Sequence, residues 1–306
     1  ITDGKGPYEI KLSRSRQITG AVDRPEQGAS VCVTTTEGEC YEFKEIAPGK
    51  YVSDSCTWRG KVGAVYTLDV VTGGKHYQSF PDTVKYTPPI DSIYFEAENR
   101  LNRFGQPLSG IAVMVDSHDK TGKTKYYKYD WVESWEIKVE WPVVFKLWRC
   151  YDSDTTKTIL LTTTSQLTED RVSRFELNYV STQGFRLVSM YSMLVKQTAL
   201  DENAFKYWSE IKKLNESTGT LYDPQPYQVK SNIFNTDDAS EQVLGYFDAS
   251  SIQEKRFFVF FDQLRGLDWP GKSCYILAEL DPEHLPRYCT DCTYHGGSLI
   301  KPDFWP

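Results

Sequence analysis

Residues 127–141 have the sequence YKYDWVESWEIKVEW. Large apolar side chains recur at odd-numbered positions, whereas charged or small polar side chains fill most of the even ones. An alternation with a period of two is typical of a β-strand that buries one face and exposes the other. The odd positions in question are Tyr127, Tyr129, Trp131, Trp135, Ile137, Val139 and Trp141. The stretch therefore predicts a long strand with one aromatic face and one charged face.

Shorter runs of the same kind lie on both sides of this strand. Before it, alternating segments are separated by tight glycine turns such as Gly73-Gly74, which is typical of β-hairpins. After it, a second long alternation runs from Phe185 to Val195. We therefore predict an all-β protein, built from two β-sandwich domains, in which antiparallel strands dominate.

The domain boundary is placed at Pro88-Pro89, because a proline pair interrupts sheet pairing and stiffens a linker. Residues 1–88 contain about seven short strands, and their order resembles the Ig-like modules of the transthyretin or carboxypeptidase-regulatory type. Residues 89–306 form the second, larger antiparallel β domain. The fold resemblance carries no activity with it.

One amphipathic helix is predicted near residues 201–216. Asp201 can cap its N-terminus, since a carboxylate oxygen accepts an unpaired backbone N–H of the first turn. Ala204, Trp208, Ile211 and Leu214 then recur at helical spacing. We expect this helix to pack over one end of a sandwich, with binding to a partner as the alternative.

Composition excludes several classes of function. The chain has 306 residues and a formal net charge of −7, so a general nucleic-acid-binding role is not expected. No stretch approaches the roughly 18 apolar residues of a membrane helix. We also expect a processed, exported product, because the sequence begins at Ile1 with no signal-like segment before its first strand.

Seven cysteines suggest disulfides in an exported protein. Cys40 and Cys56 lie symmetrically about the turn at Pro48, so a hairpin centred there would pair them. A second group can pair in three ways, and the sequence does not choose among them. That group consists of Cys150, Cys274, Cys289 and Cys292. Cys32 is left as a small buried residue.

The C-terminal pair also allows a different chemistry. Cys289, Cys292 and His295 have the spacing C-x2-C-x2-H, and thiolate and imidazole are ligands that suit zinc. The second half of a zinc-finger pattern is absent, and no helix N-terminus is expected there to activate a redox thiol. We therefore favour structural disulfides and predict no cofactor.

No catalytic motif is recognisable, so we expect a protein that is not an enzyme. The candidate ligand-binding residues come from the aromatic strand, since indole and phenol rings stack on sugar faces. They are Trp131, Trp135, Trp141 and Tyr129. The alternative is that these rings fill the space between two sheets. Weak calcium candidates occur in two acidic loops, at Asp116 and Asp119 and at Asp237 and Asp238.

Motifs spread along nearly the whole chain resemble the domain-of-unknown-function 4249 family of Gram-negative lipoproteins. They include Pro88-Pro89-Ile90-Asp91-Ser92, Trp131 with Glu133 and Trp135, Tyr207-Trp208, Asp223-Pro224-Gln225-Pro226, Gly245-Tyr246-Phe247, and Lys301-Pro302-Asp303-Phe304-Trp305. The resemblance implies a lipid-anchored outer-membrane or cell-surface protein whose gene lies beside that of a TonB-dependent receptor. It supplies no catalytic residues. A signal peptide, an acylated cysteine and one β-strand are expected to precede Ile1.

Three functions follow as hypotheses. The first is a non-enzymatic accessory of a TonB-dependent receptor, which captures a ligand or binds the receptor as its partner. The second is a carbohydrate-binding module, with a glycan or another small ligand on the aromatic strand. The third is a structural or adhesive surface protein. The membrane would be contacted only through the missing lipid anchor, with the periplasm as the alternative location.

Overall fold

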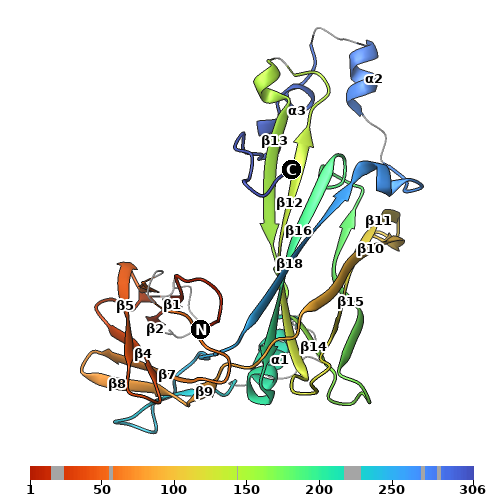
Figure 1. Ribbon diagram of the computed structural model, residues 1–306. Coiled ribbons are helices and arrows are strands. Elements are labelled where there is room, and N and C mark those ends of the chain that lie inside the picture. The colour runs from red at the N-terminus through yellow and green to blue at the C-terminus, as the bar shows by residue number, and fades with distance from the viewer. Residues whose placement is uncertain (15–23, 55–57, 143, 217–228, 270–272, 281–283) are drawn as a thin grey trace.

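Antiparallel strands dominate the computed structural model, in which 46% of residues lie in strands and 13% in helices, which confirms the β-rich prediction (Figure 1). The structure describes residues 1–14, 24–54, 58–142, 144–216, 229–269, 273–280 and 284–306. A smaller β body and a taller β body meet at an angle, so that the molecule has the outline of an L in this view. The Ig-like assignment of residues 1–88 stays a prediction.

The smaller body is an eight-stranded sheet in the order β1-β6-β5-β4-β7-β8-β17, with β9 on β7. Its strands are β1 (Glu9–Lys11), β4 (Ser30–Thr35), β5 (Cys40–Ala47), β6 (Lys50–Ser53), β7 (Val65–Thr72), β8 (Lys75–Ser79), β9 (Asp82–Thr83) and β17 (Ile233–Asn235). A separate pair is formed by β2 (Ser13–Arg14) and β3 (Arg24–Pro25). The predicted turn at Gly73-Gly74 joins β7 to β8, and both glycines have the positive φ that this two-residue loop requires.

The taller body is a curled half-barrel made of two antiparallel sheets. One sheet has the order β10-β11-β15, and the other has the order β13-β12-β16-β18 with β14 on β12. The strands are β10 (Ile90–Leu101), β11 (Pro107–His118), β12 (Tyr126–Lys138), β13 (Arg149–Thr155), β14 (Leu160–Thr163), β15 (Arg171–Ser181), β16 (Met190–Leu200) and β18 (Ile252–Phe260).

Strand β12 confirms the long strand predicted from the alternation, although it ends at Lys138 and does not extend to Trp141. Its odd-numbered side chains face the three-stranded sheet and form the core, as the stacked rings of Tyr129 and Phe175 illustrate. The indole Nε1 of Trp131 donates a hydrogen bond to the Leu177 carbonyl of β15, at 3.1 Å. The aromatic face thus joins the two sheets.

Helix α1 (Glu202–Glu216) confirms the predicted helix and its cap, because the backbone N–H of Ala204 donates to Asp201 Oδ1 at 2.6 Å. The helix packs on β12, β14 and β16. The other helices are α2 (Ser273–Leu280) and α3 (Arg287–Thr290), with 3₁₀ turns η1 (Phe145–Leu147), η2 (Phe261–Leu264) and η3 (Cys292–His295). Among the helices that the structure describes, none is long and apolar enough to cross a membrane.

The C-terminal segment docks on the taller body. The Trp305 side chain is buried and lies edge-on to the ring of Tyr151 on β13, with a second edge contact to Phe258 on β18. A backbone bridge between Tyr151 and Ser298 holds the segment alongside β13. The end of the described chain is therefore part of the packed structure.

The two bodies share structure around the proline pair. The chain crosses from β9 to β10 there, but it later returns, because β17 pairs with β8 and Phe247 and Ala249 complete the core of the smaller body. The Ala249 N–H donates to the buried Asp82 carboxylate at 2.8 Å. The boundary at residue 88 stays a prediction, and the smaller body takes residues from both sides of it.

Asp82 gives the junction a pH-dependent stability. Burial raises the pKa of Asp82 to about 6, helped by the neighbouring carboxylate of Asp248. A raised pKa means that the folded state holds this proton more tightly than the unfolded state, so stability falls as pH rises from about 4 to 6. Asp82→Asn should therefore raise the free energy of unfolding at pH 8 by about 2–3 kcal/mol and change it little at pH 4. Urea unfolding at both pH values measures this, with the surface variant Asp303→Asn as control; equal effects at both would contradict it.

Candidate functional site

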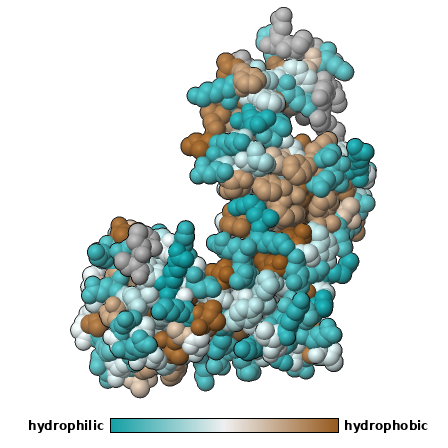
Figure 2. Space-filling view, viewed as in Figure 1, coloured by the Kyte–Doolittle hydropathy of each residue, from teal (hydrophilic) through white to brown (hydrophobic). Residues whose placement is uncertain are grey.

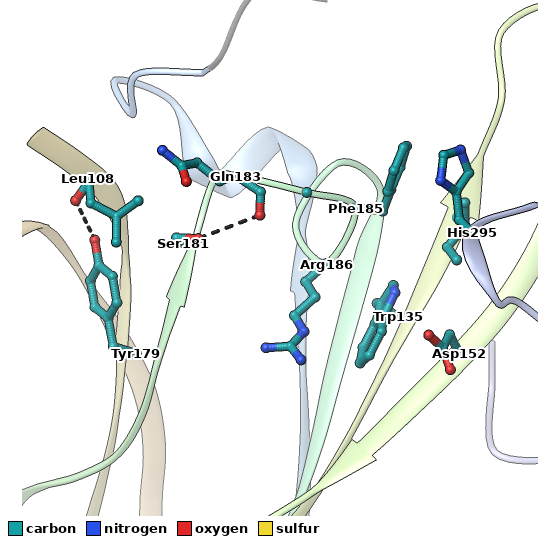
Figure 3. Close-up of a pocket in the computed structure, with 11 residues that line it drawn as sticks. Leu108, Trp135, Asp152, Tyr179, Ser181, Gln183, Phe185, Arg186 and His295 are labelled. Carbon is teal, nitrogen blue, oxygen red and sulfur yellow. Dashed lines mark hydrogen bonds between the residues drawn. The ribbon is translucent and has the colours of Figure 1, made fainter. Parts of the chain in front are cut away.

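A cavity of about 320 Å³ opens at the end of the half-barrel (Figure 3). Its walls come from β12, from the end of β15, from the segment that follows β15, and from η3 near the C-terminus. The lining residues are Leu108, Trp135, Ile137, Asp152, Tyr179, Ser181, Gln183, Gly184, Phe185, Arg186 and His295. Elements far apart in the sequence thus meet around one pocket.

Aromatic rings form one side of this pocket. The rings of Phe185 and His295 lie with their centroids 3.9 Å apart, and Trp135 projects from β12 beside them. His295 is held by a contact of 2.7 Å between its Nε2 and the Tyr288 carbonyl. Because a carbonyl only accepts, this nitrogen carries the proton, and a neutral ring presents Nδ1 as an acceptor.

Arg186 links the pocket to two acids behind it, the fully buried Glu133 and the partly exposed Asp154. Its guanidinium lies 4.8 Å from the centroid of the Trp135 ring. Nη1 lies 3.2 Å from Oε1 of Glu133, and Nη2 donates to Asp154 Oδ2 at 3.2 Å. The arginine is therefore fixed in place by one aromatic contact and two ion pairs.

Glu133 is fully buried on the inner face of β12. Its Oε2 accepts hydrogen bonds from the Tyr191 hydroxyl at 2.7 Å and from Asn178 Nδ2 at 3.2 Å. Its Oε1 has no hydrogen-bond partner among the described residues, so the contact with Arg186 is a charge contact without hydrogen-bond geometry. Burial raises the pKa of Glu133, and it raises that of Tyr191 as well.

The pocket does not form a catalytic triad, although it contains a serine, a histidine and an aspartate. Ser181 and His295 lie on opposite sides of the pocket in Figure 3. The Ser181 hydroxyl faces the Gln183 carbonyl at 3.5 Å, and His295 is bound to Tyr288. A catalytic nucleophile and its base need to lie within hydrogen-bonding distance of each other, and Ser181 and His295 do not.

The predicted aromatic platform is buried rather than exposed. Tyr129 is fully buried, and Trp131 and Trp135 are each 7% exposed, while Trp141 is partly buried and does not line the pocket. These three rings therefore fill the space between the two sheets, as the alternative interpretation of the aromatic strand had it, and they do not form an exposed row. The reason is that the curled sheet turns its aromatic face toward β10, β11 and β15, and only Trp135 reaches the open end.

The acidic loops use their carboxylates locally. Asp119 accepts hydrogen bonds from the backbone of residues 121, 123 and 124, and Asp116 accepts one from the Arg174 N–H. Asp237 accepts from the His76 N–H, and Asp238 from Ser240. No cluster of three metal-binding side chains occurs among the described residues.

Three disulfides join cysteines in the described part of the chain, and one of them corrects an expectation. Cys40 bonds to Cys32 and not to Cys56, which lies outside the described residues. Cys32 and Cys40 are diagonal neighbours across the β4–β5 hairpin, where Cys32 faces Glu42. Cys32 is therefore not the unpaired residue that the spacing suggested.

The C-terminal cysteines confirm the predicted structural disulfides. Cys150 bonds to Cys292 and Cys274 bonds to Cys289, which selects one of the three possible connectivities. Because Cys289 and Cys292 have different partners, they offer neither a thiolate pair for zinc nor a dithiol for redox exchange. The Cys150–Cys292 bond fixes η3, and with it His295, against β13.

Most residues that line the pocket were not identified from the sequence, and neither were Arg186 and Glu133, which form the ion pair beside it. Glu133 interrupts the odd-numbered series of apolar residues in the strand. A single carboxylate on a face predicted to be buried needs a polar partner, and this could have identified Glu133. Arg186 lies at a polar position of the alternation that starts at Phe185, where a charged residue is ordinary, so its pairing with Glu133 depends on the fold alone.

The fold and the pocket define a β-rich protein with a ring-lined cavity. The model of the family described as a domain of unknown function, DUF4249, matches residues 1–256. The chain therefore belongs to this family, as the motifs suggested. No curated protein matches the sequence.

Proposed function

We propose that this protein is a non-enzymatic accessory of a TonB-dependent receptor, located at the outer membrane, and that its pocket captures a ligand. The setting is suggested by the resemblance of its motifs to the lipoproteins described above. The capture role is supported by the geometry of the half-barrel. The observation that carries it is the open, ring-lined cavity beside Arg186.

The size and chemistry of the cavity suit binding. Ligand pockets usually measure 300–1,000 Å³ and combine apolar walls with a few convergent polar groups. Here Trp135 and Phe185 supply apolar area, while Asp152, Gln183 and Arg186 supply charge and hydrogen bonds. These groups can bind a ligand, but Ser181 and His295 are not paired as nucleophile and base. The pocket therefore favours ligand binding over catalysis.

A carbohydrate-binding role is the second candidate, and Trp135 is the observation in its favour. One indole beside polar donors and acceptors can recognise a single sugar ring. The burial of Tyr129 and Trp131 removes the extended platform that a long glycan would use. A purely structural or adhesive role is less favoured, since a spacer does not require a pocket.

A genetic test examines the accessory role. Deleting the gene should reduce uptake through the receptor encoded beside it, and the wild-type full-length gene should restore it. Phe185→Ala should restore uptake about tenfold less well, because it removes a ring from the pocket wall. Phe104→Ala is the matched control, since that ring is 72% exposed on the β10–β11 turn and does not line the pocket. Unchanged uptake in the deletion strain would contradict the proposal.

A further inference from the structure

The wall of the pocket contains an acid that no basic side chain neutralises. Asp152 lies on β13 directly opposite Trp135 of β12, and both side chains line the pocket. Its Oδ1 accepts the N–H of Ser153 at 2.8 Å, and it forms no ion pair with any residue that the structure describes. A carboxylate in a partly buried wall is stabilised by a cation, so Asp152 can still accept a cationic partner.

The neighbouring acids on the same face of the sheet are already paired with cations. Glu133 on β12 lies opposite Asp154 on β13, and Arg186 contacts both carboxylates at 3.2 Å. Lys157 Nζ also donates to Asp154 Oδ2, at 2.6 Å. Two cations thus face these two acids. The negative charge that remains at the pocket is that of Asp152.

The Trp135 ring already holds one cation of the protein itself. The Arg186 guanidinium lies 4.8 Å from the centroid of this ring and donates to Asp154 at 3.2 Å, so an indole and a carboxylate bind it together. In Figure 3 the Trp135 ring lies between the Arg186 guanidinium and the Asp152 carboxylate. The side of the ring toward Asp152 therefore offers the same pair of groups without a bound cation.

The remaining groups on this side add rings and an acceptor. Phe185 and His295, whose ring centroids lie 3.9 Å apart, are above Trp135 and Asp152 in Figure 3. His295 uses Nε2 for the Tyr288 carbonyl, so the neutral ring keeps Nδ1 as an acceptor. Figure 2 shows hydrophobic groups next to hydrophilic ones on the upper half of the taller body, where Figure 1 places β12 and β13.

From this arrangement we infer that the pocket binds a small organic cation, in which an ammonium group is attached to an apolar ring. The ammonium would donate to the Asp152 carboxylate and lie beside the Trp135 ring, and the apolar ring would pack against Phe185. A volume of about 320 Å³ is near the lower end of the usual range for ligand pockets, which suits a ligand with a single ring. This inference rests on the proposed capture role and names its class of ligand.

The charges at the pocket favour a cation over the other classes of ligand. An anion would be repelled by Asp152, and Arg186, which could attract it, is already held by two acids. A neutral sugar could accept and donate hydrogen bonds here, but it would leave the charge of Asp152 without a counter-charge. An ammonium group supplies both the donors and the charge that this carboxylate lacks.

Calorimetric titration of the purified full chain with three related probes tests the inference. Phenylethylamine, phenylethanol and phenylpropionate share a phenyl ring and an ethylene linker and differ in the end group, which is cationic, neutral or anionic. At pH 8 a primary amine is protonated, whereas an ordinary imidazole is neutral. The wild-type protein should bind the amine about tenfold more tightly than the alcohol, and the carboxylate most weakly. Asp152→Asn should weaken amine binding about tenfold and alcohol binding less than twofold, because the amide keeps the size of the side chain and removes its charge.

Asp303→Asn is the matched control, because it removes one negative charge from an exposed position that does not line the pocket. It should change amine binding less than twofold, and circular dichroism spectra confirm that both variants fold. Equal binding of the amine and the alcohol would overturn the inference, and so would unchanged amine binding in Asp152→Asn or no binding of any probe.

The test separates this inference from the accessory role. A protein that co-purifies with a receptor but binds no amine would overturn the inference and leave the accessory role standing. A protein that binds the amine through Asp152 but recovers no receptor would support the inference, although the accessory role would fail.

Discussion

Arg186→Ala is expected to lower the free energy of unfolding by about 3 kcal/mol at pH 8. The substitution leaves the fully buried carboxylate of Glu133 without the guanidinium that lies 3.2 Å from its Oε1. An unpaired buried charge costs several kcal/mol, and the partial exposure of Arg186 places the expected loss at the lower end of that range. Urea unfolding at fixed salt concentration provides the measurement.

The pH dependence of this loss identifies its cause. The pKa of Glu133 is already raised by burial, and removing Arg186 should raise it further. A raised pKa in the folded state means that protonation stabilises the fold, so the cost of Arg186→Ala should shrink as pH falls toward 5. Glu133→Gln in the same background should recover most of the stability at pH 8, because the amide carries no charge. A loss that is equal at both pH values, or no recovery with Glu133→Gln, would contradict the assigned role of the pair.

The second large effect is expected from the disulfide that fixes the C-terminal segment. Cys150 and Cys292 are 142 residues apart, so their bond restricts the unfolded chain over almost half its length. In the chain-entropy model, replacing both with Ala costs about 5 kcal/mol. The corresponding change at Cys32 and Cys40, which are 8 residues apart, should cost about 2.5 kcal/mol.

The two double variants form a matched pair, since each removes one disulfide and creates two alanines. Urea unfolding should give the lower midpoint for Cys150→Ala/Cys292→Ala. The same variant should loosen the pocket, because His295 lies in η3 beside Cys292. A lower midpoint for the Cys32 and Cys40 variant would show that the length of the closed loop does not set the order of stability.

Local patterns were sufficient for the parts of the fold that depend on neighbouring residues. The alternation over residues 127–141 predicted β12, because successive side chains of a strand point to opposite faces and so give the sequence a period of two. Asp201 predicted the start of α1 for the same kind of reason, since a cap acts on N–H groups two or three positions away.

Pairing across the structure was harder to predict. Strand β5 has β6 on one side and β4 on the other, so Cys40 has two neighbouring strands that could supply its partner. The sequence predicted the hairpin turn at Pro48, which places Cys56 opposite Cys40. It did not show that Cys32 on β4 also lies within bonding distance of Cys40. Symmetry about one turn therefore pointed to Cys56, whereas the bond forms across the other hairpin.

In the candidate site, too, local features were predicted and contacts between distant residues were not. Trp135 was predicted as a binding residue because aromatic side chains are recognisable individually, and it does line the pocket. Whether its neighbours on β12 were exposed depended on the curl of the sheet, which brings β15 over Tyr129 and Trp131. Glu133 and Arg186 are 53 positions apart, and nothing in the sequence around either residue predicts their contact.

Purification of the native complex tests the central claim most directly. The full-length protein, tagged at its C-terminus, is extracted gently from the membranes of the cells that produce it, and the proteins that co-purify are identified. We expect a TonB-dependent receptor in a near-stoichiometric amount, and the same yield with Phe104→Ala. Recovery of the tagged protein alone, from membranes that contain the receptor, would contradict a role as a receptor accessory.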